Sequence, residues 1–168
     1  MIKHSSLLLM CSVLLQSCAS DPLPPEPPPP PTVVNLQIEA GDDINPDIDG
    51  RGSPVMLRIY ELKEVSVFNS ADFFALFDKE QATLSSDLAR KQEFLLKPGE
   101  TKALTLEPDT DVKNIGFFAA FRQLDTAQWR ALAPVKPHQT LGYKLKIKAS
   151  QLSVEPIEQP VAPPPAKE

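Results

Sequence analysis

The sequence predicts a mainly β domain, an antiparallel β-sandwich of seven or eight strands with a small helical insertion. Two observations predict this fold class. Apolar and polar residues alternate in several short stretches, and turn-forming residues separate these stretches. Alternation with a period of two places the apolar side chains of a strand on one face, where a second sheet can cover them. Many short strands with turns between them are typical of sandwiches.

The strands are expected at residues 34–40, 55–60, 94–96, 104–106, 115–121, 129–135 and 143–147, with a short last piece at 152–154. Residues 115–121 are nearly all apolar, as in a central strand that is covered on both faces. Pro98 and Gly99 suit the two middle positions of a type II turn. Pro134 indicates an edge strand or a strand end, because proline cannot donate a ladder hydrogen bond.

The stretch near residues 70–89 departs from the alternation and is expected to be helical. Ser70 can cap a short helix, and Asp72 suits its first turn. An aromatic and apolar stripe follows at helical spacing, formed by Phe73, Leu76 and Phe77. This stripe is expected to pack against the sandwich as core; a binding groove is the alternative.

The N-terminus predicts a signal peptide over residues 1–17 and lipidation of Cys18. Lys3 precedes an apolar run that is far shorter than the roughly 20 residues needed to span a bilayer. The run ends at Leu15-Gln16-Ser17-Cys18, which has the form of a bacterial lipobox. The alternative is an ordinary signal peptide cut near Ser17 or Ala19, which would leave a free thiol.

Residues 18–31 are expected to be a lipidated, proline-rich tether. Prolines dominate this stretch and favour an extended polyproline II conformation. At about 3.1 Å per residue, residues 19–31 could reach roughly 40 Å from the lipid surface. Residues 32–155 would then form the sandwich, and residues 156–168 a disordered proline-rich tail.

The residue after the lipidated cysteine indicates the membrane. By the sorting rule of Gram-negative lipoproteins, aspartate at this position retains a protein in the inner membrane. Here the residue is Ala19, which favours the outer membrane, with the domain facing the periplasm.

Enzyme activity is not expected, and neither is a metal or another cofactor. After processing, His138 is the only histidine, so zinc sites and Cys/His nucleophile systems lack ligands or partners. The sequence contains no G-x-S-x-G motif, P-loop or Rossmann glycine pattern. A small hydrolase that uses His138 is kept as an alternative. We also expect no nucleic-acid partner and no small-molecule substrate.

An acidic stretch at residues 42–50 resembles the start of an EF-hand loop. Asn45, Asp47, Asp49 and Gly50 match the spacing, but Met56 stands where calcium requires a bidentate glutamate. No flanking helices are expected either. The stretch is therefore interpreted as an exposed acidic loop that joins two strands.

Lys144, Lys146 and Lys148 alternate with Tyr143, Leu145 and Ile147, the apolar residues of the expected strand. They could meet anionic lipid or an acidic partner. The favoured interpretation is the ordinary solvent face of a strand, where lysines also protect a sheet edge from unwanted pairing.

Several stretches together resemble the TssJ lipoproteins of type VI secretion systems. They are Asn45-Pro46, residues 50–62 (GRGSPVMLRIYEL), Phe68, residues 71–76 (ADFFAL), residues 95–100 (LLKPGE), residues 115–122 (IGFFAAFR) and Trp129-Arg130. Their order behind a lipobox is specific, and the resemblance covers residues 35–154. The long proline spacer is not a hallmark of the family.

The resemblance implies a transthyretin-like sandwich and a structural role. Members of this family are not enzymes; they sit in the outer membrane, bind the periplasmic C-terminal region of TssM and help assemble the envelope complex. The family's partner contact involves the loop between the first two strands, which here is Gly41–Ser53. The candidate contact residues are Asp42, Asp43, Asn45, Asp47, Asp49 and Arg51. The alternative is a periplasmic ligand- or peptidoglycan-binding lipoprotein, which would need a concave apolar site with convergent polar groups.

Overall fold

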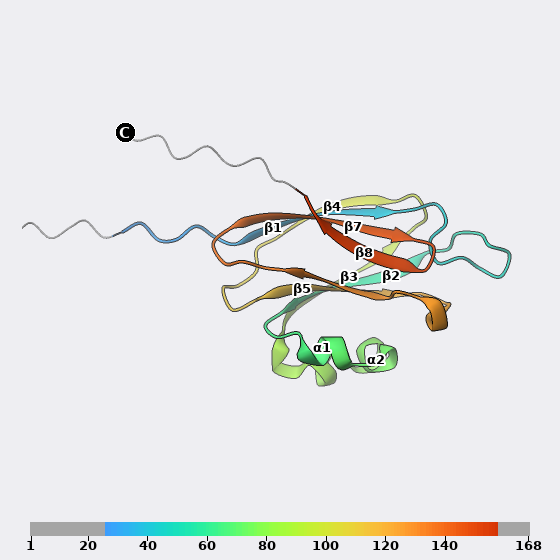
Figure 1. Cartoon of the computed structure of the whole chain (residues 1–168), viewed down its shortest axis with the longest axis horizontal. Coiled ribbons are helices and arrows are strands. Elements are labelled where there is room, and N and C mark those ends of the chain that lie inside the picture. The colour runs from blue at the N-terminus through green and yellow to red at the C-terminus, as the bar shows by residue number, and fades with distance from the viewer. Residues whose placement is uncertain (1–25, 158–168) are drawn as a thin grey trace, which may run out of the picture.

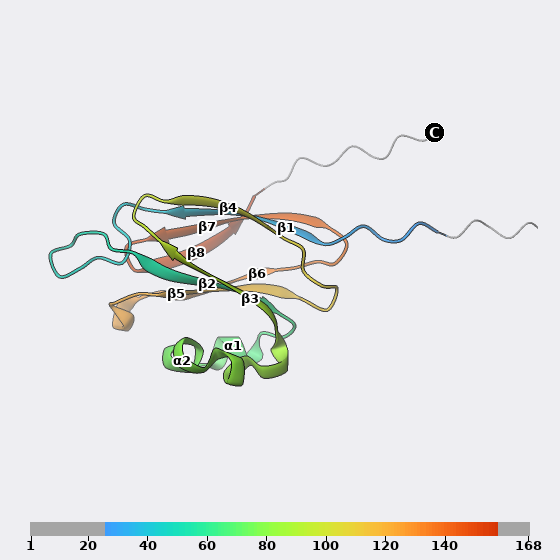
Figure 2. The same cartoon turned by 180° about the vertical axis from the view of Figure 1, so that it is seen from behind.

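The computed structural model describes residues 26–157, and Figures 1 and 2 show two stacked β-sheets with helices on the outside of one of them. The first sheet has the strand order β4-β1-β7-β8, and the second has the order β3-β2-β5-β6. The elements in chain order are β1 (Val33–Ala40), β2 (Val55–Leu62), α1 (Ser66–Ser70), α2 (Phe73–Leu84), the short 3-10 helix η1 (Ser85–Asp87), β3 (Leu88–Leu96), β4 (Thr101–Leu106), β5 (Asn114–Ala120), the 3-10 helix η2 (Leu124–Thr126), β6 (Arg130–Pro134), β7 (Thr140–Lys148) and β8 (Gln151–Pro156).

The predicted mainly β sandwich with eight strands and a helical insertion is confirmed, with one departure from antiparallel pairing. Strands β1 and β7 pair in parallel, with Leu36 opposite Tyr143. Every other named strand pair is antiparallel. The parallel pair arises because the chain builds the whole second sheet before β7 returns beside β1, so no hairpin fixes their relative direction.

The alternating residues of the strands form the core between the sheets. Leu36, Leu57, Ile59, Phe117 and Leu145 are each at most 1% exposed and belong to one apolar cluster. The opposite face of the second sheet is also buried, because α1 and α2 cover it (Figure 1). This explains why β5 is apolar on both faces, as expected for residues 115–121.

Two arginines of the second sheet hold the helices. Arg58 donates from Nη1 to the main-chain oxygens of Leu76 and Phe77 in α2, at 3.0 and 2.8 Å. Arg130 donates to the main-chain oxygens of Phe68 and Ala71 around the end of α1, at 2.9 and 2.8 Å. Arg130 thus satisfies carbonyl groups at the end of α1, and Arg58 satisfies carbonyl groups just before the kink at Lys79 inside α2.

The helical insertion begins earlier than predicted and has a different cap. Ser70 is the last residue of α1, which the sequence did not indicate as a helix, so the expected cap at Ser70 was wrong. Asp72 caps α2 instead, because its side chain accepts a 2.8 Å hydrogen bond from the main-chain nitrogen of Ala75. Leu76 is buried as expected, whereas Phe77 remains 36% exposed at the edge of the stripe.

The predicted turn at residues 97–100 carries the chain from one sheet to the other, since β3 and β4 lie in different sheets. Gly99 has a φ of 73°, which suits the third position of a type II turn and favours glycine. The other proline signal is also confirmed, because β6, which ends at Pro134, is an edge strand.

The described chain enters and leaves the sandwich at one end, and the long Gly41–Ser53 loop extends from the opposite end (Figures 1 and 2). Val33 pairs with Thr140 at the start of β7, and Ile157 donates a 2.9 Å hydrogen bond to Gly142 nearby. The predicted signal peptide, Cys18, most of the tether and nearly all of the predicted tail lie outside the described residues. Among residues 26–157, no helix combines the length and the apolar character needed to cross a bilayer.

Candidate functional site

The β1–β2 loop, residues 41–53, is fixed at its base by the end of β7 and by the turn between β7 and β8. Gly41 donates to Ile147 at 2.9 Å, and Asn45 donates from its main-chain nitrogen to Ala149 at 2.8 Å. Ile44 is fully buried in the sandwich core. Although it has no regular secondary structure, the base of the loop is held by main-chain hydrogen bonds and by the burial of Ile44.

Asn45 has a structural task inside the loop. Its φ is 46°, in the left-handed region that asparagine tolerates better than most residues. Its Nδ2 donates to the Pro54 main-chain oxygen at 2.8 Å, and its Oδ1 accepts from the Arg122 nitrogen at 2.8 Å. Asn45 is only 4% exposed, so its amide joins the loop to β2 and to the connection after β5. Among the six candidate contact residues, Asn45 is therefore a structural residue that holds the loop carrying the other five.

The tip of the loop is a compact turn organised by Asp47. The Oδ1 atom of Asp47 accepts hydrogen bonds from the main-chain nitrogens of Asp49 and Arg51, both at 2.9 Å. The Asp47 nitrogen donates to the Arg51 oxygen at 2.9 Å, and Gly50 follows with a φ of 79°. An aspartate that accepts from nitrogens two and four residues ahead stabilises a turn without any metal. Within residues 26–157 no group of three or more metal-ligating side chains is found.

Ile48 stands at this tip and is 100% exposed. Ile48 is not among the residues that the sequence pattern predicts as contacts, because the pattern marks the charged and polar side chains of the loop. The sequence signal that could have indicated its exposure is an isoleucine within a stretch that the charge pattern predicts to be solvated. A fully exposed branched apolar side chain on a rigid turn can be buried by a partner without further ordering of the loop.

Charged side chains surround Ile48. Asp49 and Arg51 form an ion pair at 3.4 Å, with side chains 60% and 76% exposed, so both charges remain available to a partner. Nearer the base, Asp43 accepts a 3.3 Å hydrogen bond from the Ala149 nitrogen, and Asp42 is exposed. The loop therefore offers an apolar tip with charges around and behind it.

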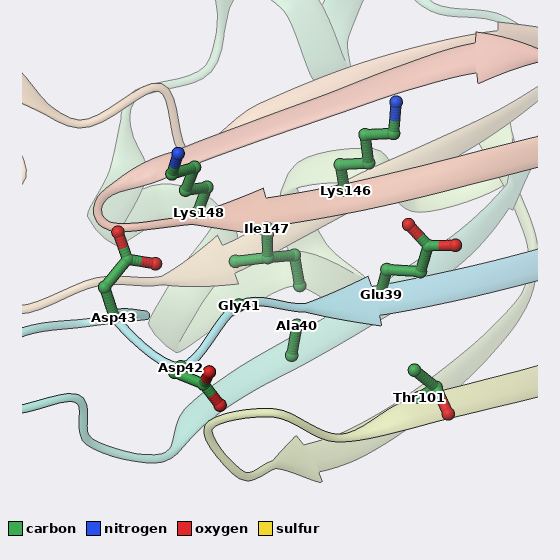
Figure 3. Close-up of a pocket in the computed structure, with 9 residues that line it drawn as sticks. All are labelled: Glu39, Ala40, Gly41, Asp42, Asp43, Thr101, Lys146, Ile147 and Lys148. Atoms are coloured by element: carbon green, nitrogen blue, oxygen red, sulfur yellow. The ribbon is translucent and has the colours of Figure 1, made fainter.

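An open hollow of about 560 Å³ lies between the loop base and the outer face of the first sheet (Figure 3). Glu39, Asp42, Asp43, Lys146 and Lys148 are among the residues that line it. In Figure 3 the ammonium group of Lys146 and the carboxylate of Asp42 point in different directions. These groups do not converge on a common point, as a small-molecule site would require.

The three lysines of β7 lie on the solvent face, as expected. Lys144 pairs with Glu39 at 2.8 Å and Lys146 with Glu155 at 2.5 Å. The idea that they protect an edge was wrong, because β7 lies between β1 and β8. The hydrogen bond and charge of Glu39 raise the pKa of Lys144, which keeps that lysine charged.

His138, the residue of the hydrolase alternative, lies at the other end of the molecule. Its Nδ1 is 2.9 Å from the main-chain oxygen of Pro30, and its main-chain nitrogen donates to Thr32 Oγ1 at 2.9 Å. A catalytic base would instead be hydrogen-bonded to a nucleophile and to an orienting group. The geometry around His138 is that of a structural contact.

Taken together, the two sheets, the helical cover and the projecting loop define a small β-sandwich domain with an exposed apolar side chain at the tip of one loop. The family model for type VI secretion lipoproteins, described as VasD, EvfM, TssJ and VC_A0113, matches residues 32–151. The chain belongs to this family of type VI secretion lipoproteins. It is a structural family that is not known as an enzyme.

Solved structures support the same assignment. The type VI lipoprotein TssJ1 from Pseudomonas aeruginosa is 37% identical over 78% of this chain and all of that one, with a TM-score of 0.76. Lip from Serratia marcescens, a membrane-bound component of the type VI secretion system, is 25% identical over 77% of this chain and 98% of that one, with a TM-score of 0.69.

A third match is a chain of a structure described as the TssM C-terminal domain (869–1107) from EAEC. It is 26% identical over 75% of this chain and 99% of that one, with a TM-score of 0.62. No curated protein matches the chain.

Proposed function

We propose that this chain is an outer-membrane lipoprotein whose β1–β2 loop binds the periplasmic C-terminal region of TssM and thereby helps assemble the type VI secretion envelope complex. The observation that carries the proposal is the hydrogen-bonded loop, which has Ile48 fully exposed at its tip and lies at the end of the sandwich opposite the start of the described chain. The match to a chain of the structure described as the TssM C-terminal domain supports the choice of partner.

Anchoring is assigned to lipid on Cys18. One acyl chain alone gives only marginal membrane residence, so the additional chains of a mature lipoprotein would be needed for stable attachment. Ala19 directs the protein to the outer membrane in this account, and the domain faces the periplasm. The sandwich would then present its loop toward a partner that rises from the inner membrane.

The chemistry of the loop defines the partner surface. Ile48 would enter an apolar socket, and burying an isoleucine side chain contributes about 1.5–3 kcal/mol. Asp42, Asp43, Asp49 and Arg51 would meet the rim of that socket, where charges tune the rate of association and the specificity more than the affinity. Asp47 and Asn45 would act indirectly by holding the turn and the loop base.

The proposal is tested by titrating the purified TssM C-terminal region against wild type, Ile48→Ser and the triple variant Ile48→Ser, Asp49→Ser, Arg51→Ser. Loss of the apolar anchor should weaken binding by about tenfold to a hundredfold. The matched control, Glu107→Ser with Lys136→Ser, changes exposed charges in connections outside the loop and should bind like wild type. Equal affinity of the loop variants and wild type would reject the loop as the contact, and equal weakening by the control would reject its specificity.

A further inference from the structure

The end of the sandwich opposite the β1–β2 loop holds the start of the described chain by two side chains. We propose that His138 and Thr32 clamp the proline segment, so that it leaves the domain as a stiff arm in one fixed direction. The sequence had predicted only a spacer that sets distance. The structure adds a joint that sets orientation.

The first anchor is Thr32, which is 4% exposed. Its Oγ1 accepts a 2.9 Å hydrogen bond from the main-chain nitrogen of His138. The following residue, Val33, donates to the Gln139 oxygen at 3.0 Å and pairs with Thr140 in the sheet. The last residue before β1 is therefore fixed to the turn between β6 and β7.

The second anchor lies two residues earlier. The Nδ1 atom of His138 is 2.9 Å from the main-chain oxygen of Pro30. A carbonyl oxygen can only accept, so Nδ1 carries the proton in this contact. His138 has a φ of 61°, which turns its main-chain nitrogen toward Thr32 while its ring reaches Pro30. A single residue thus holds the chain at two points.

The segment between and before these anchors is stiff. Pro27–Pro31 are five consecutive prolines, whose rings fix φ and favour the polyproline II helix. A stiff rod that is held at two points near its end has a defined direction. Figure 1 shows the start of the described chain running outward from the sandwich, away from the β1–β2 loop.

A hollow of about 390 Å³ lies where this arm meets the body, and its walls are Pro29–Thr32, Glu107–Thr110 and His138. The arm therefore runs beside the connection between β4 and β5. The clamp also removes Pro30 and Pro31 from the free tether, which shortens its reach by about 6 Å. That the arm points the loop away from the outer membrane rests on the lipidation of Cys18 proposed above; the fixed direction of the arm does not.

The clamp is tested in the mature full-length protein by pulsed electron–electron spin resonance. Spin labels are attached through an unnatural ketone amino acid at Glu26, in the arm, and at Lys97, in the turn at the far end of the body. A second pair at Lys97 and Lys136 reports whether the body itself is intact. Neither pair depends on TssM or on lipid, so the result is independent of the proposed function.

The expected result is a narrow distance distribution for the arm pair in wild type. His138→Gly keeps the left-handed turn but removes the ring, and Thr32→Val removes the acceptor while keeping the shape. The two substitutions together should widen the arm distribution about twofold or more, because both anchors are lost. The body pair should stay narrow. Thr140→Val, an exposed threonine in the same turn region, should change neither pair.

A wild-type arm distribution as broad as that of the double variant would overturn the clamp. A narrow distribution that persists in the double variant would show that His138 and Thr32 do not fix the arm, and would overturn it equally. If Thr32→Val alone widens the arm distribution and His138→Gly alone does not, the assignment of the histidine ring is wrong. Should the body pair also broaden in the double variant, the arm pair is measured in His138→Asn, which retains the left-handed turn and must still widen the arm distribution.

Discussion

The guanidinium group of Arg58 in β2 donates a 2.8 Å hydrogen bond to the main-chain oxygen of Phe77 in α2. The same Nη1 also bonds Leu76, and Nε pairs with Glu93 at 2.7 Å. Two residues beyond Phe77, Lys79 has a non-helical φ of −138° and the helix kinks. Kinks often form where a side chain inserts into the helical hydrogen-bond ladder. We attribute the kink to Arg58, which holds α2 against the second sheet.

Replacing Arg58 by Met should therefore destabilise the domain by about 3 kcal/mol or more, because helix carbonyls and Glu80 would lose a buried cationic partner. Chemical denaturation followed by circular dichroism measures this loss. The control is Arg51→Met, whose side chain is exposed and which should change the stability by about 0.5 kcal/mol or less. Equal stability of the two variants would show that Arg58 does not hold α2.

Acid should weaken the same contact. Burial raises the pKa of Glu80, but the hydrogen bond from Lys91 and the charge of Arg58 outweigh this effect, so the pKa lies below its ordinary value. A lowered pKa in the folded state adds stability above the ordinary pKa of a glutamate and loses it as the pH falls through the lowered value. Unfolding free energy measured against pH should fall more steeply in wild type than in Glu80→Gln. Parallel profiles would contradict this role of Glu80.

Asn45 should control the loop without touching the partner. Asn45→Gly keeps the left-handed backbone but removes the bonds to Pro54 and Arg122, and should cost about 1–3 kcal/mol of stability. Hydrogen exchange should become faster at Asp47, Asp49 and Arg51, because the loop base is loosened. Unchanged exchange in the loop would show that the Asn45 amide is not its support.

The membrane assignment predicts a separate outcome. Cys18→Ser should release the protein from membranes, because the lipid attachment point is gone. Ala19→Asp should keep the lipid but move the protein to the inner membrane, by the sorting rule for Gram-negative lipoproteins. Sucrose-gradient fractionation separates the two membranes and the periplasm. Recovery of Cys18→Ser in the outer membrane would contradict the lipidation of Cys18.

The sequence was sufficient for features that depend on local pattern. The alternation in β1 and β7, the buried β5 and the edge position of Pro134 all follow from period two and from the missing N–H of proline. The parallel pairing of β1 with β7 did not follow, because alternation gives the faces of a strand and not its neighbours. Both Ser70 and Asp72 are good helix caps, and only the structure decides between them.

The sequence predicted the position of the loop, but it did not predict which loop residues are structural and which are exposed. The sequence pattern does not separate Asn45 and Asp47 from the exposed Asp42, Asp43 and Asp49. Nothing in it distinguishes a buried amide or a turn-forming carboxylate from a solvated side chain. Their tasks depend on Arg122 and Arg51, and the first of these is far away in the chain. Ile48 was not predicted, because a single apolar residue in a charged loop belongs to no alternating or helical pattern.

The central claim is that the tip of the β1–β2 loop contacts TssM, and site-specific photo-crosslinking in intact cells tests it most directly. A benzophenone amino acid is placed at Ile48 and, as the control, at Gln37 on the outer face of the first sheet. The account predicts a crosslink from position 48 to the periplasmic region of TssM, identified by its mass, and none from position 37. A crosslink from position 37 alone, or from position 48 only to another protein, would contradict it.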